Sequence, residues 1–573
     1  MEYLGINIAD WVAIGIYLVG ITIIGVWTVS KVKDTADFFM GGRTQNKWFM
    51  MFFAFGAGTS GNDAVGVSAK TYTSGMSGIW YQWLWLFCTP FYWLIAPVMR
   101  RMRCITTGDY FDQRYSGSVE ALYALVGVSS LTFMMGGLLR GGSVIIDAVS
   151  SGAITPTYSI AGMTVLFLIY GLAGGLTAAI ITDFIQGILT VVLSFMLLPV
   201  ALGAVGGMSG LRETIADESM FTIVSPGEIN GFYIFMLCAS ALIGIVTQPH
   251  IMGVCAAGKT EYDGRFGFAM GNLLKRFCTV AWMVVGLCGL AMCISNPDIN
   301  LDDVNPNEVY GMVAKELLPT ISVGLIGVFL AALLASIMSS CDAFMVSCSG
   351  LFTQNFYRRH LVQDRDEKHY VLVGRVAAFI IVSAGMTIAY LIEDVPTFLE
   401  WFFKIQALMG AAFWLGLFWR RTTVAGVWAG TLAALLAMYL TAWPAYQPWY
   451  VENFPESMIW DNALRTSWSI FFYLTTAFGV TALVSLFTPR VSSEKLDRLY
   501  DCIRTPVKSD EPHMQVAFTL PDGVVAAQPR KLINHPDLEI YVPTRQSITG
   551  FALLWVCVGG LIYFVYWLAG VGA

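Results

Sequence analysis

Fourteen long apolar stretches are the feature of this sequence that most restricts its fold. They are 16 to 35 residues long, and an α-helix needs about 20 residues to cross the ~30 Å hydrocarbon core of a bilayer. Charged residues make up only 13% of the 573 residues and the mean hydropathy is +0.64, which excludes an ordinary soluble protein. The sequence therefore predicts an all-α polytopic membrane protein. The stretches are 8–29, 48–71, 77–99, 119–149, 158–173, 176–205, 231–256, 267–294, 318–352, 371–392, 397–419, 424–442, 467–487 and 548–570.

Basic residues are concentrated in alternate loops between these stretches, and the intervening loops are acidic or neutral. Loops rich in Lys and Arg stay on the cytoplasmic side of a membrane. We therefore expect a multi-pass protein of the plasma membrane, the inner membrane in a bacterium, with both termini outside. The basic residues of the inner loops include Lys31, Lys33, Arg43, Lys47, Arg100, Arg101, Arg103, Arg114, Lys259, Arg265, Arg358, Arg359, Arg365, Lys368, Arg420 and Arg421.

Other global features exclude several kinds of partner. The net charge of −6 averages two oppositely charged faces, so no nucleic-acid surface is implied. The 11 cysteines form no CxxC pairs and are typical of small buried residues rather than of disulfides or zinc ligands. No basic region precedes the first apolar stretch, so a cleavable signal peptide is not expected. The lipid bilayer is the expected environment, and no obligate protein partner is evident.

Seven ionisable residues within the apolar stretches are candidates for a functional role. A charge at mid-bilayer costs a few kcal/mol even on lenient scales, so such residues often mark functional sites. Any one of them can instead belong to a buried pair or hydrogen bond that holds helices together, but seven together favour a functional reading. They are Asp63, Arg140, Asp147, Asp183, His250, Asp342 and Lys404.

The segment LLASIMSSCDAFMVSCSG at 333–350 is unusually polar for a membrane helix. Ser336, Ser339, Ser340 and Ser347 follow helical spacing and form one stripe, with Asp342 beside it. Serines allow close helix packing or bond to their own helix, which explains each one alone. An aspartate beside a pair of serines offers neutral and anionic oxygens suited to a small hard cation. Sodium is the simplest candidate, with a proton as the alternative.

Two of the stretches are too polar at one point to be continuous helices. FGAGTSGNDAVG at 55–66 interrupts the second stretch, and TQPHIMG at 247–253 interrupts the seventh. Unwound backbone inside a membrane is tolerated where it lines a cavity. Two broken helices, the second lying five stretches after the first, indicate an inverted-repeat transporter whose site lies at mid-membrane.

Several motifs resemble those of the sodium/solute symporter family over about residues 8–445. SIMSSCDAFMVSCSGLFTQNFY at 336–357 is similar, without gaps, to a helix of bacterial sodium/proline symporters, and GGLTAAIITDFIQ and TQPHI also resemble that group. YQW at 81–83 and the spacing of Ser60, Asp63 and Gln82 resemble the sialic acid and sugar branches. The chain is identified by these motifs as a member of the family.

The resemblance implies a leucine-transporter-type core of two inverted five-helix repeats, with one leading helix, three trailing helices and about 14 transmembrane helices. The segment 488–547 has few large apolar side chains, so we expect a partly ordered loop rather than a separate domain. The expected units are 1–47 (leading helix and first inner loop), 48–205 (repeat 1), 231–419 (repeat 2), 420–487 (trailing helices), 488–547 (cytoplasmic loop) and 548–573 (last transmembrane helix).

The resemblance also implies a main sodium site. In this chain its ligands would be the carbonyls of Gly56, Thr59 and Ser336 and the hydroxyls of Ser339 and Ser340. Sodium is accordingly the expected coupling ion.

The resemblance also points to a second site, for a cation or a proton. Asp183 matches a family carboxylate associated with cation coupling, which serves a second sodium in some members. Where those members carry two serines, this chain has Asp342 and Ala343. Asp342 can therefore bind a proton, bind a differently placed cation, or pair with a basic side chain.

The solute pocket implied by the resemblance carries charges of both signs. An arginine near the Arg140 position holds the substrate carboxylate in the sialic acid branch, a task suited to a planar guanidinium. Asp63 replaces a neutral residue and can hold an ammonium, so the pair suits a zwitterion such as proline, another amino acid or a betaine. Alternatively, Asp63 and Arg140 pair with each other. The expected substrate-binding residues are Ser60, Asp63, Gln82, Arg140, Gln248 and His250.

We therefore expect a secondary transporter and not an enzyme: a sodium-coupled symporter of a small zwitterionic or carboxylate solute that works by alternating access. Symport of sialic acid or a sugar is the alternative. A distant alternative is an intramembrane serine protease, because GTSG at 58–61 resembles the GxSG motif, with Ser60 as nucleophile and His250 as base. A six-helix protease core would leave eight of the stretches unexplained.

Overall fold

The structure, a computed structural model, describes residues 2–28, 35–225, 229–392, 405, 407–508, 511 and 516–572. Lys404 lies outside the described residues. Within them almost all regular structure is helical, and strands occur only as two short antiparallel pairs, Glu2–Tyr3 (β1) with Ile6–Asn7 (β2) and Ile459–Trp460 (β3) with Ala463–Leu464 (β4). The prediction of an all-α protein is confirmed.

The helices of the first half include one long element with an internal break. In α9 the backbone leaves helical geometry at Gly175, where φ is 57°, a left-handed value that glycine adopts without strain. The expected stretches 158–173 and 176–205 meet at this glycine. The elements are α1 (Ile8–Thr28), α2 (Thr35–Met40), α3 (Lys47–Ala57), α4 (Gly61–Ser74), α5 (Trp80–Trp83), α6 (Thr89–Arg101), α7 (Thr107–Arg114), α8 (Gly117–Val149), α9 (Pro156–Met196), α10 (Leu198–Ala204) and α11 (Gly207–Thr214).

The second half also alternates long and short helices. After α16 the chain continues as a π-helix over Leu351–Leu361, so the helical path extends beyond the end of α16. The elements are α12 (Gly231–Ile245), α13 (His250–Ala256), α14 (Glu261–Ser295), α15 (Val309–Ile321), α16 (Leu325–Gly350), α17 (Glu367–Leu391), α19 (Gly410–Phe418), α20 (Val424–Ala442), α21 (Gln447–Asn453), α22 (Thr466–Phe487), α23 (Ser493–Arg504) and α24 (Arg545–Gly570).

The number of uninterrupted membrane helices is smaller than the number of apolar stretches. Among the described residues nine helices are long and apolar enough to cross a membrane, or ten if α12 and α13 count as one bent span. The stretches at 48–71 and 77–99 are each divided into shorter helices, and part of 397–419 lies outside the described residues. The protein is thus a multi-pass membrane protein, while the total of 14 remains a prediction.

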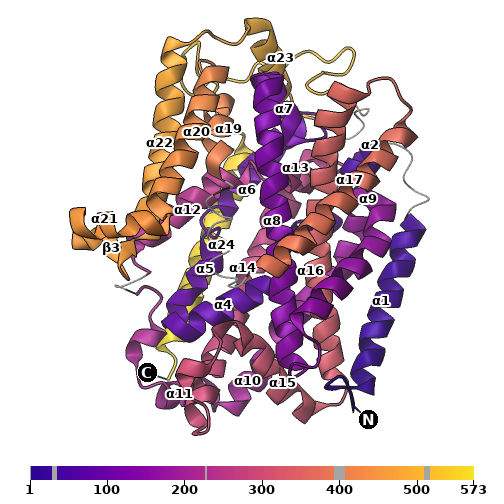
Figure 1. The fold of residues 1–573 in the computed structure, drawn as a ribbon. Coiled ribbons are helices and arrows are strands. Elements are labelled where there is room, and N and C mark those ends of the chain that lie inside the picture. The colour runs from indigo at the N-terminus through magenta and orange to yellow at the C-terminus, as the bar shows by residue number, and fades with distance from the viewer. Residues whose placement is uncertain are drawn as a thin grey trace.

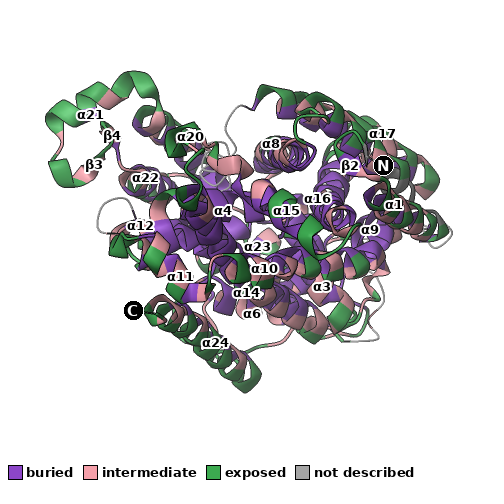
Figure 2. Cartoon of the chain, turned by 90° about the horizontal axis from the view of Figure 1, so that it is seen from below, coloured by how far each residue is buried: buried purple, intermediate pink, exposed green. Residues whose placement is uncertain are grey.

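Burial separates the inner helices from the peripheral ones. In the most apolar window of α14, and in that of the span that contains α16, 83% of residues are buried, against 22% in α1 and in α24. Figure 2 shows the same pattern, with exposed residues on the outer sides of α1, α17 and α24. The exposed residues of α1 include Val12, Ile16, Val19 and Ile23. Apolar side chains that face outward on a membrane helix meet lipid, so these helices form the lipid-facing rim.

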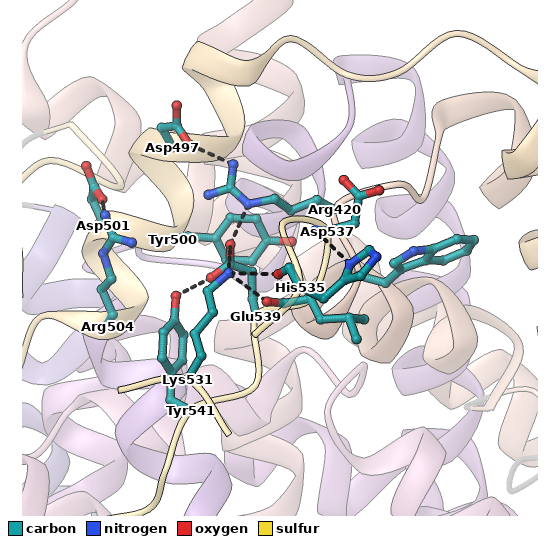
Figure 3. A network of polar contacts seen from close by, with 12 residues as sticks. Arg420, Asp497, Tyr500, Asp501, Arg504, Lys531, His535, Asp537, Glu539 and Tyr541 are labelled. Carbon is teal, nitrogen blue, oxygen red and sulfur yellow. Dashed lines mark hydrogen bonds and ion pairs between the residues drawn. The ribbon is translucent and has the colours of Figure 1, made fainter. Parts of the chain in front are cut away.

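The described parts of the segment 488–547 are tied to the helix ends by a polar network. The two chain ends lie at one end of the molecule and α23 at the other (Figure 1). Arg420 contacts Asp497 of α23 at 2.7 Å and Glu539 at 2.5 Å, and Lys531 also reaches Glu539 at 3.4 Å (Figure 3). Burial and the neighbouring Glu539 carboxylate raise the pKa of Tyr541 to about 12, so this hydroxyl stays protonated and donates a hydrogen bond to Glu539.

Two buried arginines also connect distant parts of the chain at this end of the molecule. Arg103 forms an ion pair with Glu511, with Nε and Oε1 2.5 Å apart. Arg114 donates to the carbonyls of Gly416 at 2.8 Å, Trp419 at 2.8 Å and Thr422 at 3.1 Å. These carbonyls lie in or just beyond the last turn of α19, which leaves its C=O groups without helical partners. The guanidinium of Arg114 therefore caps a helix formed about 300 residues later in the chain.

Candidate functional site

The first helix break separates α3 from α4 at residues 58–60. Gly58 is the C-cap of α3, and Ser60 is the N-cap of α4, where its backbone N–H donates to the Asp63 carboxylate at 2.9 Å. Glycine after a helix and serine followed three residues later by an acidic residue are common end and start signals. The interruption predicted within 55–66 is confirmed.

The second break separates α12 from α13. The two helices meet at an angle of 74° across residues 246–249. Pro249 lies at the start of α13, where its missing backbone N–H costs no helical hydrogen bond. The interruption predicted at 247–253 is also confirmed, and residues from both breaks line one cavity.

The residues expected to bind sodium gather beside the first break. The Ser340 hydroxyl donates to the Gly56 carbonyl at 2.8 Å and lies 3.4 Å from the Thr59 carbonyl. The Ser336 hydroxyl accepts a hydrogen bond from the Gly61 backbone N–H at 2.8 Å. Gly56, Thr59, Ser336 and Ser340 are all buried. The unwound end of α3 and one face of α16 thus present neutral oxygens to each other, a donor set that suits sodium.

Ser339 connects this oxygen cluster to a buried carboxylate on α9. Its hydroxyl donates to Asp183 Oδ1 at 2.6 Å, and both residues are fully buried. The other carboxylate oxygen, Asp183 Oδ2, is buried without a hydrogen-bond partner in the described part of the chain. The helices approach closely here, because a Cβ on Gly56 would lie 2.2 Å from Ser339 Oγ. Glycine at position 56 therefore makes room for the serine.

Asp342 lies in the region around Asp183, and so do Tyr17 and Gln186, two residues that the sequence analysis missed. Asp342 is 1% exposed and interacts electrostatically with Asp183. Tyr17 of α1 interacts with both carboxylates and accepts a hydrogen bond from Gln186 Nε2 at 3.0 Å. The leading helix therefore contributes a hydroxyl to the region around Asp183. A tyrosine within an apolar stretch gave no sequence signal of this role.

A cavity of about 60 Å³ lies between the two breaks. Five of the six expected substrate-binding residues line it, and Ser340 of the oxygen cluster does so as well. Arg140 is not among the lining residues, and its Nε is buried without a hydrogen-bond partner in the described regions. The expected residues at the cavity are Ser60, Asp63, Gln82, Gln248 and His250.

Asp63 is already paired within the protein. Its Oδ1 accepts a hydrogen bond from Gln82 Nε2 at 2.7 Å, and its Oδ2 lies 2.9 Å from Lys275 Nζ. Lys275 also donates to the Gly58 carbonyl in the first break. The alternative that Asp63 pairs with Arg140 is wrong, because Lys275 of α14 lies at the break and forms the ion pair with the Asp63 carboxylate.

Lys275 and Arg276 are cavity residues that the sequence analysis missed. Both line the cavity, and each cationic group lies 5.7 Å from the ring centre of Trp85. Arg276 donates to the Gln82 carbonyl at 2.8 Å. A signal was present in the sequence, because LLKRFC at 273–278 places two adjacent basic residues inside the apolar stretch 267–294.

The geometry gives no support to a serine protease. Ser60 and His250 line the same cavity, but a nucleophile needs a hydrogen-bonded base. The His250 ring packs against Phe344 with 4.9 Å between ring centres, and its Nδ1 has no hydrogen-bond partner among the described residues. His250 therefore serves as part of the cavity wall.

Comparison with known proteins gives a consistent family. The sequence model of the sodium:solute symporter family matches residues 38–434. The chain is 26% identical to a sodium/glucose cotransporter of Vibrio parahaemolyticus, over 81% of this chain and 91% of that protein. It is 25% identical to a sodium/proline symporter of Haemophilus influenzae, over 76% of this chain and 89% of that protein. These relatives are transporters and not enzymes.

A solved structure shows the same fold. The structure of a Na⁺-coupled sialic acid symporter in a substrate-bound outward-open state matches with a TM-score of 0.71 and 17% identity, over 84% of this chain and 99% of that chain. The family match covers more than half of the sequence, and the fold agrees with it. The chain is therefore a member of the sodium:solute symporter family, as its motifs predict.

Proposed function

We propose that this protein carries a small organic solute into the cell together with sodium, by alternating access. The observation that carries the proposal is the position of Ser340, which both lines the cavity and bonds to the Gly56 carbonyl of the broken helix. A sodium ion held by the oxygens of Gly56, Thr59, Ser336, Ser339 and Ser340 would touch the same break that positions Ser60 and Asp63. The relatives named for proline and glucose support sodium coupling.

The proposed architecture follows from the family and the two breaks. We propose two inverted five-helix repeats, residues 48–205 and 231–419, within about 14 transmembrane helices in the plasma membrane. The leading helix, the trailing helices 420–487, the cytoplasmic loop 488–547 and the last helix 548–573 complete the chain. Both termini would lie outside, in agreement with the basic residues at the opposite end of the molecule.

Coupling would arise because the ion and the solute order the same unwound segment. Sodium that binds only when residues 56–61 adopt this conformation stabilises the solute site by the same amount that the solute stabilises the sodium site. One sodium ion supplies about 2.3 kcal/mol per 100 mV and about 1.4 kcal/mol per tenfold gradient. Together, ~3.7 kcal/mol sustains an accumulation of roughly 500-fold for a neutral solute.

Asp183 and Asp342 form the second part of the proposal. Two buried carboxylates that interact with each other favour a bound cation or proton. Ser339 belongs to both regions, because it contacts Asp183 and is the neighbour of Ser340. A second cation or a proton at this position would therefore be linked to the main sodium site.

The test compares two serines on the same helix. Ser340→Ala removes a proposed sodium ligand, and hydrogen-bond-type contacts to a charged group are worth about 1.5–3 kcal/mol. We expect a half-saturating sodium concentration about 10- to 100-fold higher, measured as sodium-dependent thermal stabilisation of the purified protein. Ser347→Ala is the matched control, because its hydroxyl bonds to the Ala343 carbonyl of its own helix at 2.7 Å.

Uptake into proteoliposomes then tests transport itself. Labelled proline, a betaine, sialic acid, glucose and lactate are supplied with a sodium gradient and with potassium in its place. Sodium-dependent uptake of one class supports symport. Unchanged sodium affinity in Ser340→Ala would contradict the proposed ion site. Uptake that is equal with sodium and with potassium would contradict the coupling.

A further inference from the structure

We infer that the solute is a small monocarboxylate that also carries a hydrogen-bond donor such as a hydroxyl, rather than a zwitterion or a sugar. This inference rests on the proposed function, because it concerns the cavity beside the proposed sodium site. It depends on the charges around the cavity, the unpaired polar atoms in its wall, and its size.

The charges of the cavity wall do not balance. Asp63 is the only carboxylate among the described lining residues, whereas Lys275 and Arg276 both contribute cationic groups. Asp63 forms its ion pair with Lys275 at 2.9 Å. Arg276 is 1% exposed and also interacts electrostatically with Asp63, but it has no ion-pair partner of its own in the described part of the chain. One carboxylate thus faces two cationic groups. A buried cation without a partner is costly, so a solute anion is the missing counter-charge.

Arg276 also presents a free donor. Its two terminal nitrogens bond to the Gln82 carbonyl at 2.8 Å and to Asn272 Oδ1 at 3.4 Å. Its Nε is buried without a hydrogen-bond partner within the described regions. The Tyr92 hydroxyl, 0% exposed and also in the cavity wall, has no partner there either. A carboxylate, which accepts several hydrogen bonds, would satisfy both groups.

One unpaired acceptor completes the recognition pattern. Gln82 uses its Nε2 for Asp63, and its Oε1 is buried with no hydrogen-bond partner in the described residues. Buried polar atoms that are left unpaired cost free energy, so a native ligand is expected to satisfy them. A hydroxyl or amide N–H on the solute can donate to this oxygen. The solute therefore combines an anionic acceptor with a neutral donor.

A zwitterion fits this wall poorly. The Asp63 carboxylate already accepts from Gln82 at 2.7 Å, from the Ser60 N–H at 2.9 Å and from Lys275 at 2.9 Å. A solute ammonium that approached Asp63 would meet the Lys275 ammonium on the same oxygen. Like charges at such a distance repel strongly in a site that excludes water. Asp63 thus holds Lys275 in place and is not available to bind a substrate amine.

The size of the cavity limits the solute further. The cavity of about 60 Å³ is small beside the roughly 300–1,000 Å³ of ordinary ligand pockets. Such a space suits a solute with few non-hydrogen atoms, such as a short hydroxy acid. A hexose or sialic acid is much larger and would require the wall to rearrange.

The charge of the solute also determines the driving force. One sodium ion moving with one monocarboxylate carries no net charge, so the membrane potential contributes nothing. A tenfold sodium gradient alone then sustains about a tenfold accumulation. A neutral or zwitterionic solute would instead respond to the potential.

The experiment compares acids with their own amides, which have the same shape and no charge. The probes are glycolate, lactate and 3-hydroxybutyrate, their primary amides, proline and glucose. Each is added to the purified wild-type protein in sodium or in potassium, and the thermal stability is recorded. We expect at least one acid to stabilise the protein in sodium at a concentration about 10- to 100-fold lower than its amide.

Two further measurements keep the result independent of folding. Arg276→Gln is expected to remove the preference for the acid over the amide while sodium alone still stabilises the protein. With one sodium ion per acid, uptake of the preferred acid into proteoliposomes is expected to be unchanged when an inside-negative potential is imposed with potassium and valinomycin, whereas a second cation or proton at Asp183 and Asp342 would make uptake rise with the potential.

The outcomes separate this inference from the proposed function. Stabilisation by proline or glucose in sodium, with no acid active, overturns the inference and leaves sodium symport intact. Equal half-saturating concentrations of an acid and its amide also overturn it. A protein that responds to neither sodium nor any probe overturns the proposed function itself.

Discussion

The Asp63–Lys275 ion pair makes the sharpest prediction for stability. The side chains of both residues are 6% exposed, and the charged atoms lie 2.9 Å apart. In Lys275→Met the carboxylate remains buried with hydrogen bonds from Gln82 and Ser60 but without its ion-pair partner. Removing one partner of a buried pair costs about 3–5 kcal/mol. We expect a decrease of this size in the free energy of unfolding.

The double variant isolates the pairing. Asp63→Asn/Lys275→Met leaves neither charge of the pair in place. An amide accepts fewer hydrogen bonds than a carboxylate, so this variant should lose only one hydrogen bond at position 63, about 1 kcal/mol. It is therefore expected to be about 2–4 kcal/mol more stable than Lys275→Met alone. The measurement is unfolding by denaturant titration in lipid–detergent micelles for the wild type, both single variants and the double variant.

A lysine outside the cavity provides the control. Lys315 on α15 is exposed, so Lys315→Met should change the free energy of unfolding by no more than about 0.5 kcal/mol. If the two single changes at Asp63 and Lys275 add to within about 0.5 kcal/mol in the double variant, then the two residues do not form a coupled buried pair. The assignment of Asp63 as a residue that holds Lys275 would then be wrong.

Two further variants test other parts of the structure. Gly56→Ala places a Cβ 2.2 Å from Ser339 Oγ, so we expect at least a tenfold loss of sodium affinity by the thermal assay; unchanged affinity would show that Ser339 does not need this space. Glu539→Gln weakens charge-assisted bonds to Arg420 and Lys531, worth about 1.5–3 kcal/mol, so proteolysis of the segment 488–547 should be about 10-fold faster or more. Exposed Glu494 gives the control Glu494→Gln, and equal cleavage rates for the two variants would contradict the role of the network.

The sequence predicted the helix breaks and the oxygen cluster because both depend on local residue chemistry. Gly58 and Ser60 end and start helices whatever surrounds them. Ser336, Ser339 and Ser340 share a helix face by spacing alone. The resemblance to the family then connected that face with the carbonyls of Gly56 and Thr59. Ser340 and these carbonyls lie together in the structure.

The partners of the charged residues could not be predicted in the same way. Asp63 and Lys275 are 212 positions apart, and periodicity carries no information on which buried cation reaches which carboxylate. The position of Tyr17 near Asp183 could not be predicted either, because a single tyrosine in an apolar stretch is typical of packing or of a lipid interface. Arg140 was placed at the pocket by resemblance, but the lysine and the arginine that line the cavity, Lys275 and Arg276, come from α14 instead. Long-range pairing depends on how the helices are arranged, which one sequence does not specify.

Arg103 and Arg114, at the end of the molecule that holds α23, can form their final contacts only late in synthesis. Arg103 is fully buried and contacts Glu511, which lies 408 positions later in the chain. Arg114 donates to carbonyls that follow it by about 300 positions. At a synthesis rate of about 5–20 residues per second, Arg103 stays without its partner for roughly 20–80 s after it leaves the ribosome. During that interval neither guanidinium has the partner that it contacts in the folded protein. The buried contacts of both arginines therefore form late, when much of the chain has already been synthesised.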